Sequence, residues 1–173
     1  MVRIRKGTQA DAALLSELAL RTFMDTFAAQ NNPDDVIKHI AERYSVSIQR
    51  DELSDPSLTY LIAEVDGAAA AFAMIGEPRS ESCGNFVKPI ELFRFYVDKS
   101  WHGKGVAQPL MQACYEEALR RGGETICLSV WEHNPRAIRF YEKMGYANSG
   151  TQPYVLGDDV QTDFVMTREI PRG

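Results

Sequence analysis

The sequence predicts a single domain of mixed α/β class, and three observations lead to that prediction. Apolar runs of strand length alternate with amphipathic segments of helix length along residues 1–173. No internal repeat, low-complexity stretch or linker separates one part of the chain from another. A chain of this length buries roughly two-thirds of its unfolded surface as one domain.

The first half of the chain predicts one strand, two helices and a hairpin. Residues 2–5 alternate as a strand does, and Thr8 is placed to cap a helix that continues to about Phe27. Asn32 and Pro33 start a second helical segment, with one apolar stripe formed by Val36, Ile37, Ile40 and Tyr44. Strands are expected over 57–65 and 68–76 around an Asp-Gly turn, and residues 77–88 form a surface loop.

The second half predicts a strand, a helix and a strand, followed by a short helix and two final strands. The first strand covers 90–97, the helix runs from about Val106 to Arg121 and is ended by two glycines, and the next strand covers 125–130. Asn134 caps the short helix, which ends at Gly145, and the final strands turn around residues 157–159. The right-handed crossover between 90 and 130 places a glycine loop at a helix N-terminus, where an anion is favoured.

Composition sets limits on the class of protein. The 45% hydrophobic and 25% charged residues are ordinary for a globular domain, and no apolar run approaches the roughly 20 residues of a membrane span. The net charge of −5 argues against general binding of nucleic acid. Cys83, Cys114 and Cys127 lack metal-ligand spacing, and Cys114 and Cys127 are expected as small core residues, so a cytoplasmic location is expected.

The glycine loop, residues 102–108, fits neither common nucleotide fingerprint. A dinucleotide loop requires glycine where Gln108 stands, and no acid for a ribose follows at the right distance. A triphosphate loop that starts at Gly103 requires a final glycine at Gln108 and then a lysine, and both are missing. The loop alone therefore leaves open some other anion or a plain turn.

Two blocks together resemble the GNAT superfamily of N-acetyltransferases, which use acetyl-CoA. The family loop Q/R-x-x-G-x-G/A corresponds to residues 102–107, with His102 in place of the usual glutamine or arginine and Ala107 as the permitted alternative to glycine. The later family pattern N-x-x-A-x-x-F-Y-x-x-x-G-F/Y is matched by Asn134, Ala137, Phe140, Tyr141, Gly145 and Tyr146. The resemblance covers about residues 58–168.

The resemblance implies a mostly antiparallel central sheet of six to seven strands flanked by about four helices. It also implies that loop amides hold the coenzyme pyrophosphate, that backbone of a bulged strand holds the pantetheine arm, and that Asn134 contacts the coenzyme besides capping its helix. These cofactor-binding positions are Phe95, Tyr96, Val97, His102, Gly103, Lys104, Gly105, Val106, Ala107, Gln108, Asn134 and Tyr141. Lys104 could add charge, although such a lysine is usually solvated.

Two side chains are candidates for proton transfer. Tyr141 occupies the position at which many family members use a tyrosine as general acid, and a phenol can protonate a departing thiolate. Glu91 occupies the position of a glutamate that acts as base in some members, and strict alternation would place it on one face with Phe93, Phe95 and Val97. The alternatives are a packing tyrosine and a solvated carboxylate at a strand start.

The acceptor is expected to be a primary amine. Similarity to polyamine-acetylating bacterial members is loose, and a protein amine or another small amine stays open. Acidic side chains at the first helices and in the 77–88 loop could receive a cation, namely Asp25, Asp34, Asp35, Glu77 and Glu81. His39, His102 and His133 have no metal-ligand spacing, so no metal is expected. A homodimer is a reasonable expectation for the fold. The rival class is a non-catalytic module that binds acyl-CoA.

Overall fold

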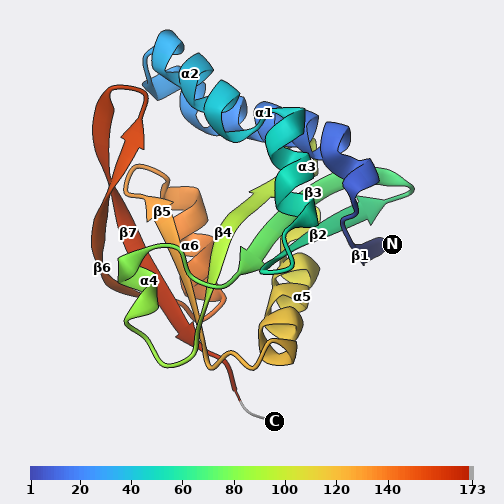
Figure 1. The fold of residues 1–173 in the computed structure, drawn as a ribbon, viewed down its shortest axis with the longest axis vertical. Coiled ribbons are helices and arrows are strands. Elements are labelled where there is room, and N and C mark those ends of the chain that lie inside the picture. Colours follow the sequence, from blue (N-terminus) through green and yellow to red (C-terminus); the bar gives the residue numbers. More distant parts are fainter. Residues whose placement is uncertain (172–173) are drawn as a thin grey trace.

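The computed structural model describes residues 1–171 and is organised around one seven-stranded sheet (Figure 1). Its strand order is β1-β2-β3-β4-β5-β7-β6, with β4 and β5 parallel and the other neighbours antiparallel. The strands are β1 Val2–Lys6, β2 Leu58–Val65, β3 Ala68–Gly76, β4 Pro89–Val97, β5 Thr125–Trp131, β6 Ala147–Leu156 and β7 Asp159–Glu169. The mixed α/β class and the mostly antiparallel sheet are confirmed.

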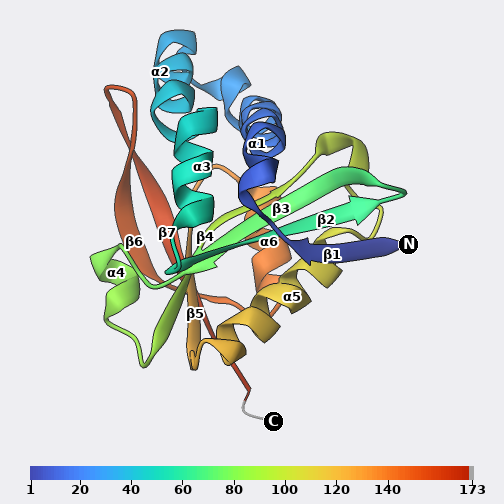
Figure 2. The ribbon, with the colours of Figure 1, turned by 45° about the vertical axis from the view of Figure 1, so that its right-hand side comes forward.

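Helices cover both faces of the sheet (Figure 2). One face carries α1 Ala12–Phe27, α2 Pro33–Arg43 and α3 Val46–Ser54, and the other carries α5 Ala107–Arg120 and α6 Pro135–Lys143. Phe23 and Phe72 lie in the apolar core of the first face, whereas Leu110 and Met111 lie in that of the second. The sheet thus separates two cores, and any site that uses both faces must pass between strands.

The helical segment after Asn32 is two helices rather than one. Asn32 caps α2 as expected, through a bond from the Asp34 amide to its Oδ1 of 2.9 Å. The Ser45 hydroxyl then accepts from the Ile48 amide at 3.3 Å and starts α3. Ile37, expected on the buried stripe, is 63% exposed, because α2 lies at the rim of the sheet with Val36 and His39 turned inward.

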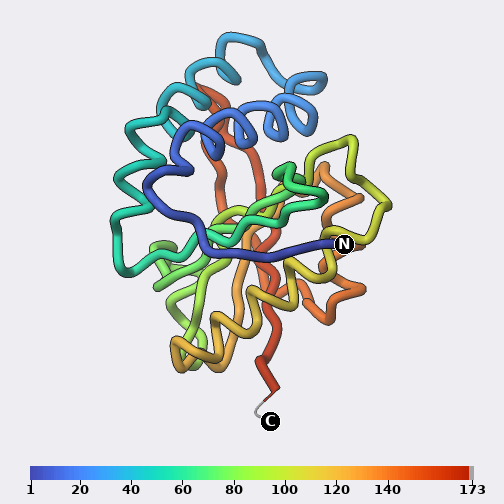
Figure 3. The backbone as a smooth tube through the Cα atoms, turned by 90° about the vertical axis from the view of Figure 1, so that its right-hand side faces the viewer, coloured from blue at the N-terminus to red at the C-terminus, as the bar shows by residue number. Residues whose placement is uncertain are grey.

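The C-terminal hairpin β6–β7 extends to the end of the molecule where α2 lies (Figure 3). At its turn the Asp158 amide donates to the Asp35 carboxylate at 3.2 Å, and Lys38 pairs with Asp158 at 3.4 Å. The hairpin, α1 and α2 therefore lie at the same end of the sheet, next to the C-terminal ends of β4 and β5.

Candidate active site

The sheet opens between β4 and β5. The two strands pair only from Pro89 to Leu92 and from Thr125 to Leu128. Beyond these residues the 93–97 segment of β4 and the 129–131 segment of β5 no longer pair with each other, although both continue as strands. The free edges face each other across a cleft of about 650 Å³ that both segments line.

A bulge at Phe93 changes which side chains of β4 share a face. Met74 pairs with Arg94 and Ile75 with Leu92, so Phe93 is the extra residue. Phe93 therefore stays on the face of Glu91, and Phe95 and Val97 turn to the core under α5 and α6. The expectation that Phe95 and Val97 share a face with Glu91 was wrong, because strict alternation does not hold across a bulge.

The glycine loop ends in an uncapped helix. Gly103 and Gly105 have φ of 73° and 76°, which are favourable for glycine, and α5 begins without a capping side chain. Within residues 1–171 no protein acceptor bonds the amides of Gly103, Gly105, Val106, Ala107 and Gln108. Such a row of free N–H groups at a helix N-terminus matches what a bound phosphate requires.

Two other loop side chains have clear contacts. The His102 ring donates from Nε2 to the Val97 carbonyl at 2.8 Å and so ties the loop to the end of β4. The Lys104 ammonium lies 5.2 Å from the centre of the Trp101 ring. His102 thus braces the loop, and its side chain has a structural role at this position.

Tyr141 lies on α6 at the second face of the opening. Asn134 caps α6 as expected, because its Oδ1 accepts from the Ala137 amide at 3.2 Å. The Tyr141 ring packs edge-on against Phe95 with centroids 6.2 Å apart, and both residues line the cleft. Burial, and to a lesser degree the Cys114 thiol, raises the pKa of Tyr141, so its hydroxyl is protonated at neutral pH.

Glu91 lies at the opposite side of the cleft, and it is buried rather than solvated. Its carboxylate accepts hydrogen bonds from the Arg79 amide at 2.8 Å, the Ser80 amide at 3.2 Å and the Ser80 hydroxyl at 3.1 Å. The alternative of a solvated strand start is excluded by its 7% exposure. Glu91 holds the 79–80 segment in place while it lines the cleft.

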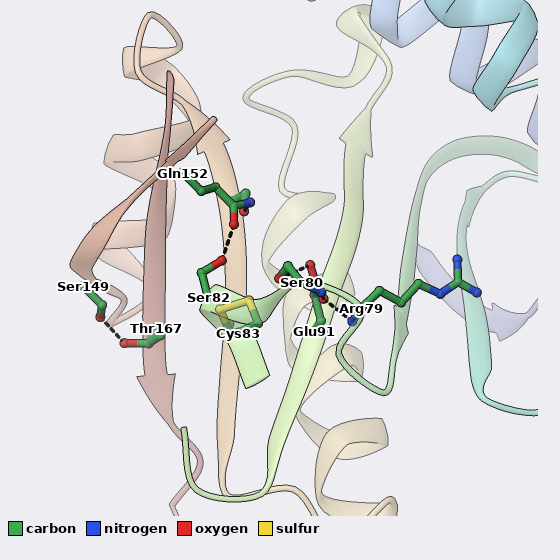
Figure 4. Close-up of a disulfide and its surroundings, with 10 residues drawn as sticks. Arg79, Ser80, Ser82, Cys83, Glu91, Ser149, Gln152 and Thr167 are labelled. Carbon is green, nitrogen blue, oxygen red and sulfur yellow. Dashed lines mark hydrogen bonds between the residues drawn. A yellow bond between two sulfur atoms is a disulfide. The ribbon is translucent and has the colours of Figure 1, made fainter. Parts of the chain in front are cut away.

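A disulfide fixes the same segment from the other side (Figure 4). Cys83, in the short helix α4 Glu81–Gly84, is bonded to Cys127 of β5. The sequence-based interpretation of Cys127 as an unpaired core residue was therefore wrong, whereas Cys114 is a free and buried thiol as expected. The disulfide also removes the ground on which a reducing compartment was expected.

The cleft holds several residues that sequence reasoning did not single out. Aromatic and acidic side chains from the α1–α3 region, the end of β5 and the C-terminal hairpin line it, among them Phe27, His39, Glu42, Tyr44, Glu52, Trp131, Tyr154 and Asp163. His39 is buried, and its ring Nε2 lies 2.8 Å from the Tyr154 hydroxyl. Burial lowers the pKa of His39 to about 4, so this ring is neutral at neutral pH.

The acidic residues expected to face the acceptor do not line this cleft. Asp25, Asp34, Glu77 and Glu81 are exposed, and Asp35 bonds the Asp158 amide. Asp163 is a buried acid that does line the cleft, and one signal in the sequence indicates it. It occupies the same face of β7 as the buried Val165, so alternation puts an acid at an inward position.

Metal-binding clusters and membrane-spanning helices are two other features for which the structure gives an answer. In the part of the chain that the structure covers, no cluster of three or more histidine, cysteine, aspartate or glutamate side chains is arranged to hold a metal ion. Over residues 1–171, no helix has both the length and the apolar character that crossing a bilayer requires.

Comparison with known proteins assigns the family. The model of the acetyltransferase (GNAT) family matches residues 19–146. An N-acetyltransferase of Mycobacterium bovis is 31% identical over 162 residues, which cover 92% of this chain and 98% of that protein. The structure of PaiA N-acetyltransferase from Thermoplasma acidophilum in complex with coenzyme A has a TM-score of 0.78 at 21% identity, covering 98% of this chain and 99% of that one.

Two additional relatives have acceptors in their names. The spermine/spermidine N(1)-acetyltransferase of Bacillus subtilis is 30% identical over 86 residues, or 49% of this chain and 57% of that protein. The L-methionine sulfoximine/L-methionine sulfone acetyltransferase of Salmonella typhimurium is 26% identical over 152 residues, or 88% of this chain and 84% of that protein. These names describe different amines for different relatives.

The chain belongs to the acetyltransferase (GNAT) family. It is an acetyl-CoA-dependent N-acetyltransferase, as the resemblance of the two sequence blocks implied. The family fold expected from those blocks is also confirmed by the seven-stranded sheet.

Proposed function

We propose that this enzyme transfers the acetyl group of acetyl-CoA to a primary amine by direct attack in a ternary complex. The observation that carries the proposal is one continuous cleft between β4 and β5. It is lined by Tyr141 and Asn134 on the side of α6 and by Glu91 and Asp163 on the side of α1–α3. Donor and acceptor can therefore approach the opening from opposite faces and meet between the strands.

The free amides of the 103–108 segment support a role in holding the coenzyme pyrophosphate. They point out of an uncapped helix start, and the two glycines leave the backbone accessible. The unpaired edge of β4 from Phe95 to Val97 is suited to hold the pantetheine arm, which carries amides of its own. Asn134 lies where the arm would pass α6, since it also lines the cleft.

Two proton transfers complete the proposed reaction. Acetyl-CoA supplies an acyl group activated as a thioester; the amine nitrogen forms the new C–N bond as the C–S bond breaks. Glu91 receives the proton of the attacking amine, directly or through water, because only the neutral amine has a free electron pair. Tyr141 donates its hydroxyl proton to the departing sulfur. Burial that raises the pKa of the phenol also raises that of a thiol held beside it.

The acceptor class proposed is a small primary amine, and a polyamine is one member of it. The partial similarity to a spermine/spermidine enzyme supports a polyamine, whereas the methionine sulfoximine relative supports an amino-acid-like amine. The aromatic and acidic lining of the cleft favours a cationic substrate with an aliphatic body.

The rival class that the sequence left open, a module that binds acyl-CoA without catalysis, disagrees with the family assignment. The Glu91 carboxylate accepts three hydrogen bonds, and a purely structural role for Glu91 would also account for these bonds. Release of free thiol from acetyl-CoA across a panel of amines separates the two functions. Amine-dependent release supports the transferase, and tight coenzyme binding without release on any amine would support the module.

A further inference from the structure

Asp163 is a buried carboxylate with no hydrogen-bond partner among residues 1–171. Within residues 1–171 the other buried acids all have hydrogen bonds or ion pairs, namely Asp11, Glu91, Asp98 and Glu117. Asp163 is only 6% exposed and its Oδ1 is fully buried. Neither of its oxygens accepts a hydrogen bond from any residue in the 1–171 range. Buried polar groups are almost always satisfied, so such an exception calls for a ligand or another explanation.

The surroundings of Asp163 suit a cation. Asp163 of β7 pairs with Trp131 of β5 on one side and with Gln152 of β6 on the other, so the three side chains share a face of the sheet. Trp131 stacks in a tilted manner on Phe27 with ring centroids 5.2 Å apart, and both rings line the cleft with Asp163. Aromatic faces attract cations, and their bulk keeps water away from the carboxylate.

The other cleft acids are either engaged or exposed. Glu52 bonds the Arg94 guanidinium at 2.8 Å and Glu91 holds the 79–80 segment, whereas Glu42 is exposed at the cleft rim. Burial, followed by the charge of Glu132, raises the pKa of Asp163 to about 7. A bound positive charge would offset both effects, since it favours the ionised carboxylate.

We propose that Asp163 binds a second ammonium group of the acceptor, one that does not react. The proposal rests on the proposed function, in which a primary amine is acetylated. The acceptor class it names is a diamine, or a longer polyamine, with an aliphatic spacer between its nitrogen atoms.

The reacting nitrogen binds elsewhere for two reasons. The attacking amine must be neutral, so a carboxylate dedicated to a positive charge serves a group that stays charged. In addition, Tyr141 lies on α6 at the opposite face of the sheet, and Asp163 is one strand beyond β5. A spacer between two nitrogen atoms bridges these positions.

The test compares cadaverine with n-pentylamine, which has the same carbon chain and a single amine. Steady-state acetylation is measured for the wild type, Asp163→Asn and Asp159→Asn. Asp159 lies on the same strand and is exposed, so its variant matches the change of charge. We expect Asp163→Asn to lower kcat/KM for cadaverine by about 10- to 100-fold, mainly through KM, as for loss of a hydrogen bond to a charged group. Activity on n-pentylamine should be unchanged in Asp159→Asn, and in Asp163→Asn it should fall much less than activity on cadaverine.

Equal losses on both amines would overturn the proposal, because Asp163 would then act on the reacting nitrogen or on the fold. Unchanged cadaverine kinetics in Asp163→Asn would overturn it as well. Melting temperatures of all three proteins, recorded in the same buffer, identify a loss that comes from unfolding.

Calorimetric titration of the coenzyme A complex separates this proposal from the proposed function. Tighter binding of cadaverine than of n-pentylamine, lost in Asp163→Asn, supports the ammonium subsite even if the wild type acetylates neither amine. Equal binding of both amines by the wild type would overturn the subsite, although acetylation of n-pentylamine would leave the proposed function intact.

Discussion

Glu91 and Cys127 lie directly opposite each other on the parallel pair β4–β5, and one short segment holds both. Cys83 is bonded to Cys127, while the amides of Arg79 and Ser80 donate to Glu91. The 79–83 segment therefore bridges the two strands just before they part, and it fixes the closed end of the cleft (Figure 4).

Loss of the disulfide should destabilise the protein and loosen this bridge. It closes a loop with a sequence separation of 44 residues, and Cys83→Ser or reduction should lower the free energy of unfolding by about 2–4 kcal/mol. Thermal unfolding with and without reductant measures the effect, and hydrogen exchange at Arg79 and Ser80 should accelerate. The double serine variant at 83 and 127 is the control and should not respond to reductant. Identical unfolding of the oxidised and reduced wild type would contradict the prediction.

Substitution of Gly105 should impair the glycine loop. Its φ is 76°, and an alanine in this left-handed region costs about 1–2 kcal/mol, although a Cβ would meet no atom within 4 Å. Gly105→Ala should lower the melting temperature and raise KM for acetyl-CoA, because the free amides would shift. Gly84→Ala is the matched control, since its added Cβ is also unobstructed and its φ is not in the left-handed region. Equal KM values for both variants would rule out a positional role for Gly105.

Asp163 should make the protein less stable as pH rises. Its pKa is about 7 in the folded protein against a reference value of 3.8. Between these values the folded state keeps a proton that the unfolded state has released, so stability falls with increasing pH and levels off above 7. Asp163→Asn removes this contribution and should unfold at a higher temperature than the wild type at alkaline pH. The difference in melting temperature between the wild type and Asp163→Asn, measured across pH, isolates the contribution of Asp163. A difference that stays constant with pH would contradict the prediction.

Glu91→Gln should change the pH dependence of turnover rather than coenzyme binding. The amide cannot take a proton from the attacking amine, so the rate should become dependent on the deprotonated fraction of the free amine. The kcat/KM profile of the variant should therefore keep rising towards the pKa of the amine. Ser80→Ala serves as the control, because it removes one bond to Glu91 and leaves the carboxylate. A variant profile that overlays the wild type would exclude Glu91 as the base.

The sequence predicted the parts of the site that local geometry determines. The cap at Asn134, the glycine loop and the helix start near Val106 each depend on a few neighbouring residues, and each is present. The crossover from β4 to β5 was predictable as well, because a strand, a helix and a strand in succession favour parallel pairing.

The remaining features depend on which strands lie side by side. The bulge at Phe93 exists only relative to β3, and the pairing of Cys83 with Cys127 requires α4 to lie over β5. Asp163 could be placed inward by alternation, but its position in the cleft depends on β7, rather than β6, being the neighbour of β5. Register of this kind is a long-range property that no short motif encodes.

The central claim, acetyl transfer in the opening between β4 and β5, is tested most directly by Tyr141→Phe. The substitution removes one hydroxyl and keeps the ring against Phe95. The account predicts that kcat for amine acetylation falls by about 10²- to 10⁴-fold, the usual contribution of a general acid, while the Kd for acetyl-CoA is unchanged. A Tyr141→Phe enzyme with wild-type kcat would contradict the account.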